Sequence, residues 1–151
     1  MSTYTDANTL TDKLNDLLEK TYDAEKGYKK AAENADSSNL QAYFERKSKE
    51  RNEFGHKIKA EIQTFGNDVD KGGSATGAMH RTWMDVKAFF SADSDESMLE
   101  EAIRGEKASV EEYKEVLKDT ALPPSTSTVL TQQMNQISTD LSNIKSLEDL
   151  K

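Results

Sequence analysis

Between residues 99 and 117 the apolar side chains recur at steps of three or four residues, the spacing of one buried face of an α-helix. The positions on this face are Leu99, Ile103, Glu106, Val110, Tyr113 and Leu117. One of them, Glu106, is a carboxylate. An ionised carboxylate among apolar side chains is strongly unfavourable unless a cation, a metal ion or a proton compensates it. The group that faces Glu106 therefore constrains what this chain can fold into.

The composition is typical of a single, mainly helical domain over residues 1–151. A chain of 151 residues can bury one core without disulfides. Cysteine is absent, which excludes thiolate metal sites and thiol catalysis and fits a reducing cytoplasm. Only two prolines occur, at 123 and 124, and helix-forming residues are plentiful.

The charge distribution bears on the partners that the chain can have. The net charge is -8, from 28 acidic and 20 basic residues that alternate along the sequence. Such a surface disfavours binding to the phosphates of nucleic acids. No apolar run is long enough to span a membrane, and the first residues lack the pattern of a signal peptide. We therefore predict a cytoplasmic protein that binds neither nucleic acid nor membrane.

Periodicity, capping residues and helix breakers predict five helices. Their ranges are 6–34, 38–66, 75–90, 95–120 and 125–149. Four are long, and short connections join the first two and the last two, so each pair should form an antiparallel hairpin. The stretch that includes 75–90 carries the chain between the hairpins. The order predicts an all-α, ferritin-like four-helix bundle of two antiparallel helix hairpins with an extra short crossover helix.

The helix predicted over 38–66 carries two cations, Lys47 and Arg51, among its inward positions. Either their aliphatic stems cover the core while the charges reach water, or the charges form an interior ion pair. Counting residues from the turns places Arg51 level with Glu106, and Lys47 level with Glu25. The second alternative therefore predicts a buried salt bridge between Arg51 and Glu106, with Lys47 and Glu25 as a second pair.

A di-iron carboxylate site in such a bundle needs a glutamate from each of two helices and a Glu-x-x-His motif from each of the other two. The motif occurs at Glu53 and His56. If Phe54 points inward, however, neither of these residues faces the core. The helix predicted over 125–149 has no such motif, so a conventional di-iron site is disfavoured.

Several motifs resemble those of a known family. They are Gly27-Tyr28 with Ala31-Ala32, Arg51-Asn52-Glu53-Phe54, Gly77-Ala78-Met79-His80-Arg81-Thr82-Trp83 leading to Lys87, and Arg104-Gly105-Glu106. In these motifs the chain resembles, over nearly its whole length, small bacterial four-helix-bundle proteins of uncharacterised function, related in fold to the ferritin-like superfamily. It departs in the last helix, where similar proteins tend to carry a histidine and this chain has Leu141 and Ser142. The resemblance implies a fold and a bacterial source, but no settled activity.

The crossover-helix motif is the most specific of these, and its members are Gly77, His80, Arg81, Trp83 and Lys87. Trp83 should anchor the short helix to the bundle, or, if exposed, mark a docking surface. A single histidine beside Arg81 is more typical of capping or packing than of metal binding.

The sequence contains no catalytic triad spacing and no phosphate-binding loop, which favours a non-catalytic protein over an enzyme. We predict a bundle protein, stress-associated or an interaction module, that holds Glu106, Arg51, Lys47 and Glu25 in place of a di-iron site. It would need no cofactor, and its partner would be an unknown protein or a second copy. The alternative is a ferritin-like metal-binding or iron-oxidising protein that holds iron or another divalent metal with Glu106 and Glu25.

Overall fold

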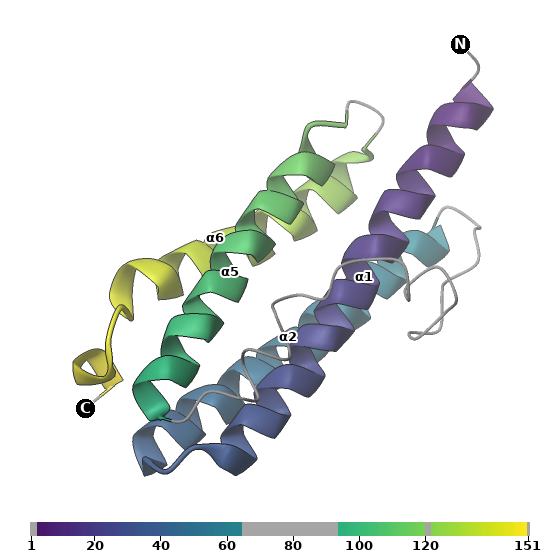
Figure 1. Ribbon diagram of the computed structural model, residues 1–151. Coiled ribbons are helices and arrows are strands. Elements are labelled where there is room, and N and C mark those ends of the chain that lie inside the picture. Colours follow the sequence, from purple (N-terminus) through teal and green to yellow (C-terminus); the bar gives the residue numbers. More distant parts are fainter. Residues whose placement is uncertain (1–2, 65–93, 120–121, 151) are drawn as a thin grey trace.

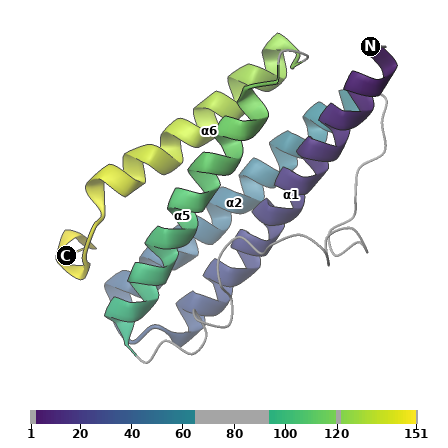
Figure 2. The ribbon, with the colours of Figure 1, turned by 45° about the horizontal axis from the view of Figure 1, so that its top comes forward.

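The computed structural model describes residues 3–64, 94–119 and 122–150, and four long helices dominate these ranges (Figure 1). The helices are α1 (Thr3–Asn34), α2 (Ser38–Thr64), α5 (Asp95–Leu117) and α6 (Pro124–Asn143), followed by the short 3₁₀ helix η1 (Leu147–Leu150). Helices α1 and α2 form one antiparallel hairpin, α5 and α6 form the other, and the hairpins lie side by side in both ribbon views (Figures 1 and 2). The predicted all-α four-helix bundle is confirmed.

The predicted bounds hold to within a few residues for three of the long helices. Helix α1 begins at Thr3 instead of residue 6, and α5 ends at Leu117 instead of residue 120. Helix α2 extends to Thr64. Residues 65 and 66 lie outside the described residues, as does the predicted crossover helix over 75–90 with its motif of Gly77, His80, Arg81, Trp83 and Lys87.

The prediction of one continuous helix over 125–149 was wrong. Helix α6 ends at Asn143, and Ile144 adopts an extended conformation with φ -120° and ψ 99°. The carboxylate of Asp149 accepts hydrogen bonds from the backbone N–H groups of Lys145 (2.8 Å) and Ser146 (3.1 Å). A side chain that bonds nearby backbone groups in this way stabilises a turn in place of a continuing helix.

Polar contacts fasten the two hairpins together at both ends of the bundle. The carboxylate of Asp95, in the first turn of α5, accepts hydrogen bonds from the backbone N–H groups of Asp36 (2.9 Å) and Ser37 (2.8 Å) in the turn between α1 and α2. At the opposite end, Glu61 of α2 accepts hydrogen bonds from the hydroxyls of Ser125 (2.9 Å) and Thr126 (2.7 Å) in α6. These contacts fix the register of one hairpin against the other.

The apolar core consists of two clusters that follow one another along the bundle. In α2, the first includes Leu40 and Phe44, and the second includes Phe54, Ile58 and Ile62. Helix α5 is divided in the same way, with Met98, Leu99 and Ala102 in the first cluster and Val110, Tyr113 and Val116 in the second. The residues between the clusters, near position 50 of α2 and position 106 of α5, are charged.

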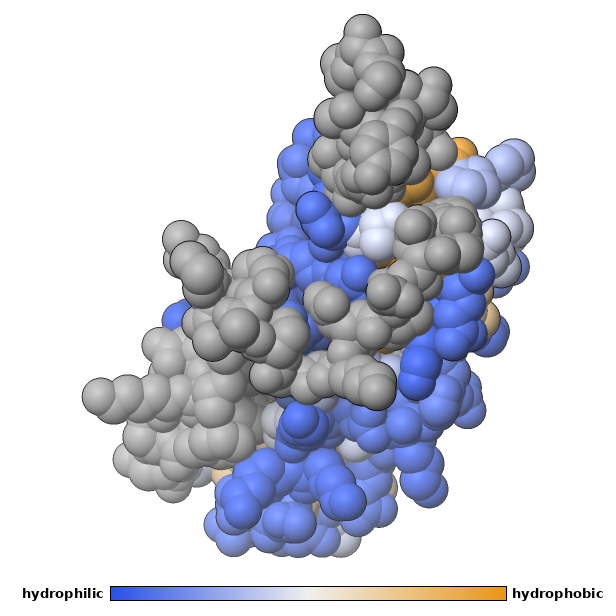
Figure 3. Space-filling view, turned by 90° about the vertical axis from the view of Figure 1, so that its right-hand side faces the viewer, coloured by the Kyte–Doolittle hydropathy of each residue, from blue (hydrophilic) through white to orange (hydrophobic). Residues whose placement is uncertain are grey.

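The outer surface is polar. On the face shown in Figure 3, hydrophilic residues cover most of the described surface. None of the described helices is both long and apolar enough to cross a membrane.

Candidate functional site

Helices α2 and α5 bring three charged side chains into the core between the two apolar clusters. Lys47 and Arg51 lie one turn apart on α2, on the same inward face as Phe44 and Phe54, because residues four apart share a helix face. Their residues are 0% and 1% exposed, and Glu106, which meets them from α5, is 1% exposed. The interior ion pair, and not the solvent-reaching arrangement, is therefore the one that occurs.

Arg51 pairs directly with Glu106, as predicted. Its Nη2 atom contacts Oε1 of Glu106, and its Nη1 atom donates a hydrogen bond to Oε1 of Glu50 at 3.0 Å. The guanidinium also lies over the rings of Tyr28 and Phe54, 5.8 Å and 5.7 Å from their centroids. Arginine suits this place because its planar group can bind carboxylates along its edge and stack on aromatic rings with its face.

Lys47 is surrounded by three carboxylates from three helices. Its Nζ atom lies 2.7 Å from Oε1 of Glu50 in α2, 2.9 Å from Oε2 of Glu106 in α5 and 2.7 Å from Oδ2 of Asp140 in α6. The ammonium thus links both hairpins. We call the five residues Lys47, Glu50, Arg51, Glu106 and Asp140 the charged layer.

The outer edge of the charged layer lies between α2 and α6. Oε2 of Glu50 accepts a hydrogen bond from the amide of Gln136 at 2.8 Å. Arg46, whose side chain is 52% exposed, lies 3.7 Å from Oδ2 of Asp140. The three carboxylates and two cations of the charged layer have a net charge of -1, and Arg46 at the rim brings it to zero.

The electrostatics of the site keep Glu106 and Lys47 ionised. Burial disfavours the charged form of Glu106, but Arg51 and Lys47 reverse this effect and hold its pKa below the ordinary value. Burial likewise disfavours the charged form of Lys47, but Glu106 and Glu50 raise its pKa above the ordinary value. Burial, followed by the charge of Glu106, raises the pKa of Tyr28, so this phenol stays neutral.

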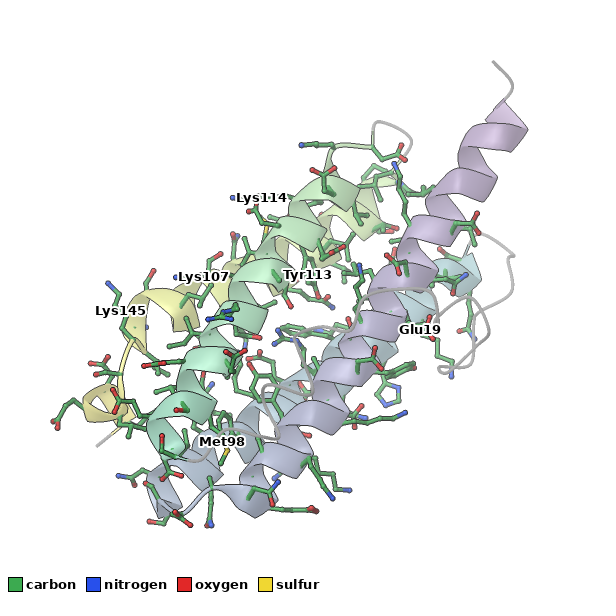
Figure 4. The ribbon with its side chains drawn as sticks, in the orientation of Figure 1. Glu19, Met98, Lys107, Tyr113, Lys114 and Lys145 are labelled. Atoms are coloured by element: carbon green, nitrogen blue, oxygen red, sulfur yellow. The ribbon has the colours of Figure 1, made fainter. Side chains whose placement is uncertain are left out.

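A neutral polar contact extends this region into the second apolar cluster. The hydroxyl of Tyr113 donates a hydrogen bond to Oε1 of Gln133 at 2.7 Å, and the Gln133 amide donates to the backbone oxygen of Phe54 at 3.3 Å. In Figure 4, Tyr113 extends from α5 toward α1, whereas Lys114 extends to the opposite side. The contact satisfies two polar groups that the bundle buries.

Glu25 was wrongly predicted as the partner of Lys47. It is half-buried and accepts a hydrogen bond from the amide of Asn52 at 3.1 Å. Its neighbour Ala24 is the residue that points into the core. One residue further along a helix is a rotation of about 100°, which turns Glu25 to the outer edge between α1 and α2.

Glu50 and Asp140 belong to the charged layer although the sequence analysis did not identify them. Glu50 stands three residues after Lys47, a spacing that permits an ion pair within one helix, and it also contacts the adjacent Arg51. Asp140 is the single charged residue of α6, and its position beside the partly buried Leu141 was the available signal.

Residues 9–119 match the family described as a domain of unknown function, DUF2383. The chain belongs to this family. In fold, the DUF2383 chain is similar to the crystal structure of ferritin like, diiron-carboxylate proteins from Bacillus anthracis str. Ames, with a TM-score of 0.66 and 20% sequence identity, over 99% of this chain and 96% of that chain. This likeness establishes a ferritin-like fold. No curated protein matched the sequence.

A ferritin-like fold raises the question of whether this DUF2383 chain can hold a di-iron centre. In the described ranges, no three or more His, Asp or Glu side chains are arranged to hold a metal ion. Glu53 and His56, the residues of the Glu-x-x-His motif, are both exposed. The buried carboxylates are already paired with Lys47 and Arg51, two cations that repel a metal ion. The donor set of the described residues therefore does not fit a di-iron centre.

Proposed function

We propose that this protein is a non-catalytic ferritin-like bundle in which the charged layer replaces a di-iron site. The observation that carries the proposal is the ammonium of Lys47, 2.7 to 2.9 Å from three carboxylate oxygens. These oxygens are the ligands that a metal ion in the core would need. Since side-chain cations neutralise them, the layer joins the helices and needs no cofactor.

The energetics of the layer support a structural role. A metal ion could bind Glu106 only after displacing both Lys47 and Arg51, which would then be buried without partners. Removing one partner of a buried ion pair costs about 3–5 kcal/mol. The free energy of metal binding would have to exceed this cost for both Lys47 and Arg51.

Iron content and iron oxidation test this function directly. The protein is expressed in iron-rich medium, its metal content is measured, and Fe(II) oxidation by the purified protein is followed in air. We expect much less than one iron per chain, and oxidation no faster than in buffer. Stoichiometric iron that is lost in Glu106→Gln, and retained in the exposed control Glu53→Gln, would support the iron-oxidising alternative instead. Iron that is lost in Glu25→Gln as well would assign the second ligand of that alternative.

We further propose that the protein associates with a second copy of itself through the outer face of α6. The exposed and half-exposed polar residues of this face are uncharged: Ser127, Thr128, Thr131, Gln132, Asn135, Gln136, Ser138, Thr139, Ser142 and Asn143. Asp140 is the one charged residue of α6, and it pairs with Lys47. Two chains that each carry a net charge of -8 repel each other least when they meet through an uncharged surface such as this face of α6. The centres of protein interfaces are also depleted in charged residues. A stress-associated role stays a prediction from the sequence.

Sedimentation velocity over a range of concentrations, at physiological salt, tests the association. We expect a dimer at high concentration that Gln132→Glu/Asn135→Glu dissociates by placing like charges at the interface. The matched control, Ala60→Glu/Gln63→Glu, adds the same charges at the same spacing to an exposed part of α2 and should leave the dimer intact. A monomer at all concentrations, or equal effects of the two double variants, would contradict an interface on α6.

A further inference from the structure

We infer that Glu50, Glu106 and Asp140 form a cation site that Lys47 fills with its own ammonium group, and that Lys47 is the residue that excludes free cations from it. This inference deepens the proposed function and rests on it. Shortening Lys47 should therefore convert a structural layer into a binding site.

The geometry around the Lys47 ammonium is that of a cation site. Its three oxygen neighbours come from three helices and lie within 2.9 Å of Nζ, and the side chain is 0% exposed. An ammonium group carries three N–H donors, the same number as the oxygens that surround it. One of these oxygens, Oε2 of Glu106, is wholly buried and lies 2.9 Å from Nζ.

The charge left behind would attract such a cation. Without Lys47, the three carboxylates face Arg51 alone inside the bundle, a net charge of -2 in the charged layer. Arg51 would stay bonded to Oε1 of Glu106 and Oε1 of Glu50. Oε2 of Glu106 would lose its ammonium partner, and Oδ2 of Asp140 would keep only Arg46 at the rim, 3.7 Å away.

A free cation has a route to this place. The Asp140 side chain is 15% exposed, so the layer reaches the surface on the α6 side. A groove between α2 and α6 is lined by Arg46, Glu50 and Gln136, among others. Glu50 thus borders both the groove and the ammonium of Lys47.

The distances indicate which cations fit. Contacts of 2.7 to 2.9 Å suit an ammonium ion, whereas oxygens coordinate Ca²⁺ at about 2.3–2.6 Å and Mg²⁺ at about 2.0–2.1 Å. An alkylammonium therefore fits without movement, whereas either metal ion would need closer contacts. Methylammonium is the best probe, because it restores the missing end of the lysine side chain.

The test is chemical rescue of Lys47→Ala. We expect its melting temperature to lie well below that of the wild type and to rise saturably with methylammonium chloride. Tetramethylammonium chloride at equal ionic strength should have little effect, because it has no N–H donor. The melting temperature of the wild type should respond alike to both salts. An identical response of Lys47→Ala to the two salts would overturn the inference.

Lys20→Ala is the matched control. Lys20 also bridges two carboxylates, those of Asp16 (3.2 Å) and Glu112 (2.9 Å), but its side chain is 15% exposed at the surface between α1 and α5. We expect no difference between methylammonium and tetramethylammonium for this variant. A saturable rescue of equal size would mean that any lysine removal gives this response, which would also overturn the inference.

A measurement on the wild type covers the case in which Lys47→Ala does not fold. In ¹H–¹⁵N spectra near neutral pH, the Nζ protons of Lys47 should exchange slowly with water and show couplings to the carboxyl carbons of Glu50 and Asp140. Exchange as fast as that of Lys114, whose side chain is 56% exposed, would contradict a closed site. Stoichiometric metal in the wild type would instead contradict the proposed function, so the two failures are distinguishable.

Discussion

Arg51 of α2 and Glu106 of α5 form their ion pair at the level where the two apolar clusters of the core meet. The pair spans the two hairpins, since α2 belongs to one and α5 to the other. An apolar contact can slide along a helix at small cost, but a buried charge has to meet its partner. We therefore interpret the pair as a device that fixes how the hairpins align.

Glu106→Ala should lower the free energy of unfolding by about 3–5 kcal/mol. The substitution leaves the guanidinium of Arg51 and the ammonium of Lys47 buried without their shared partner. Urea denaturation followed by circular dichroism measures the change. The control is Glu111→Ala, which removes an exposed ion pair with Lys114 and should cost less than about 1 kcal/mol. Equal losses of unfolding free energy for the two variants would show that the buried pair stabilises the fold no more than an exposed one.

Replacing both partners should restore most of that stability. In Arg51→Met/Glu106→Leu no charge is stranded, because Lys47 keeps its contacts with Glu50 and Asp140. Apolar residues in place of a buried ion pair are often neutral or stabilising. We therefore expect the free energy of unfolding of the double variant to lie within about 1 kcal/mol of the wild-type value. A double variant as unstable as Glu106→Ala would mean that the pair contributes net stability instead of specificity.

The Arg51–Glu106 pair was predictable because two simple regularities locate it. Helical periodicity gives the inward face of each helix, and equal residue counts from a tight turn give the level along the bundle. Both are properties of single helices and hairpins. The same regularities placed the four long helices and the exposed positions of Glu53 and His56.

The other members of the charged layer depend on contacts between hairpins, which a single sequence does not encode locally. Glu50 lies about 100° around the helix from Arg51, and it is buried because α6 covers that side with Gln136. Asp140 is recognisable as a partner only when Lys47 is known to face α6. The prediction for Glu25 was wrong because a residue at the edge of an apolar helix face can point toward the core or toward solvent. Its hydrogen bond with Asn52 holds it at the outer edge.

Acid should destabilise the fold through Glu106. Its folded-state pKa lies below the ordinary value of 4.5, since Arg51 and Lys47 outweigh the effect of burial. A group with a lowered pKa stabilises the fold above its unfolded pKa, and this contribution is lost as the pH falls through the folded value. We expect the melting temperature of the wild type to fall below pH 4.5 more steeply than that of Glu106→Gln. Parallel curves for the two proteins would contradict this assignment.

At high pH, the fold should lose stability through deprotonation of Lys47. Although burial disfavours its charged form, Glu106 and Glu50 raise its pKa above 10.5. A raised pKa stabilises the fold below the unfolded value, and this contribution is lost as the pH rises through the folded value. We expect the stability of the wild type to decline above pH 10.5, and that of Lys47→Met to decline less. The control variant is Lys20→Met, which removes a lysine at the surface instead of one in the charged layer.

Gly55→Ala should destabilise the protein even though alanine is the better helix former. A Cβ atom at position 55 of α2 would lie 2.9 Å from Cε1 of the Tyr22 ring in α1, closer than real Cβ contacts. Overpacking of this kind costs about 1–3 kcal/mol, against a gain of about 1 kcal/mol in helix propensity. Urea denaturation should therefore show a net loss for Gly55→Ala. In a Tyr22→Ala background the obstacle is gone, and the same substitution should be neutral or stabilising. Gly55→Ala with wild-type stability would show that the Tyr22 ring moves aside freely, and that the two helices do not need a glycine at this contact.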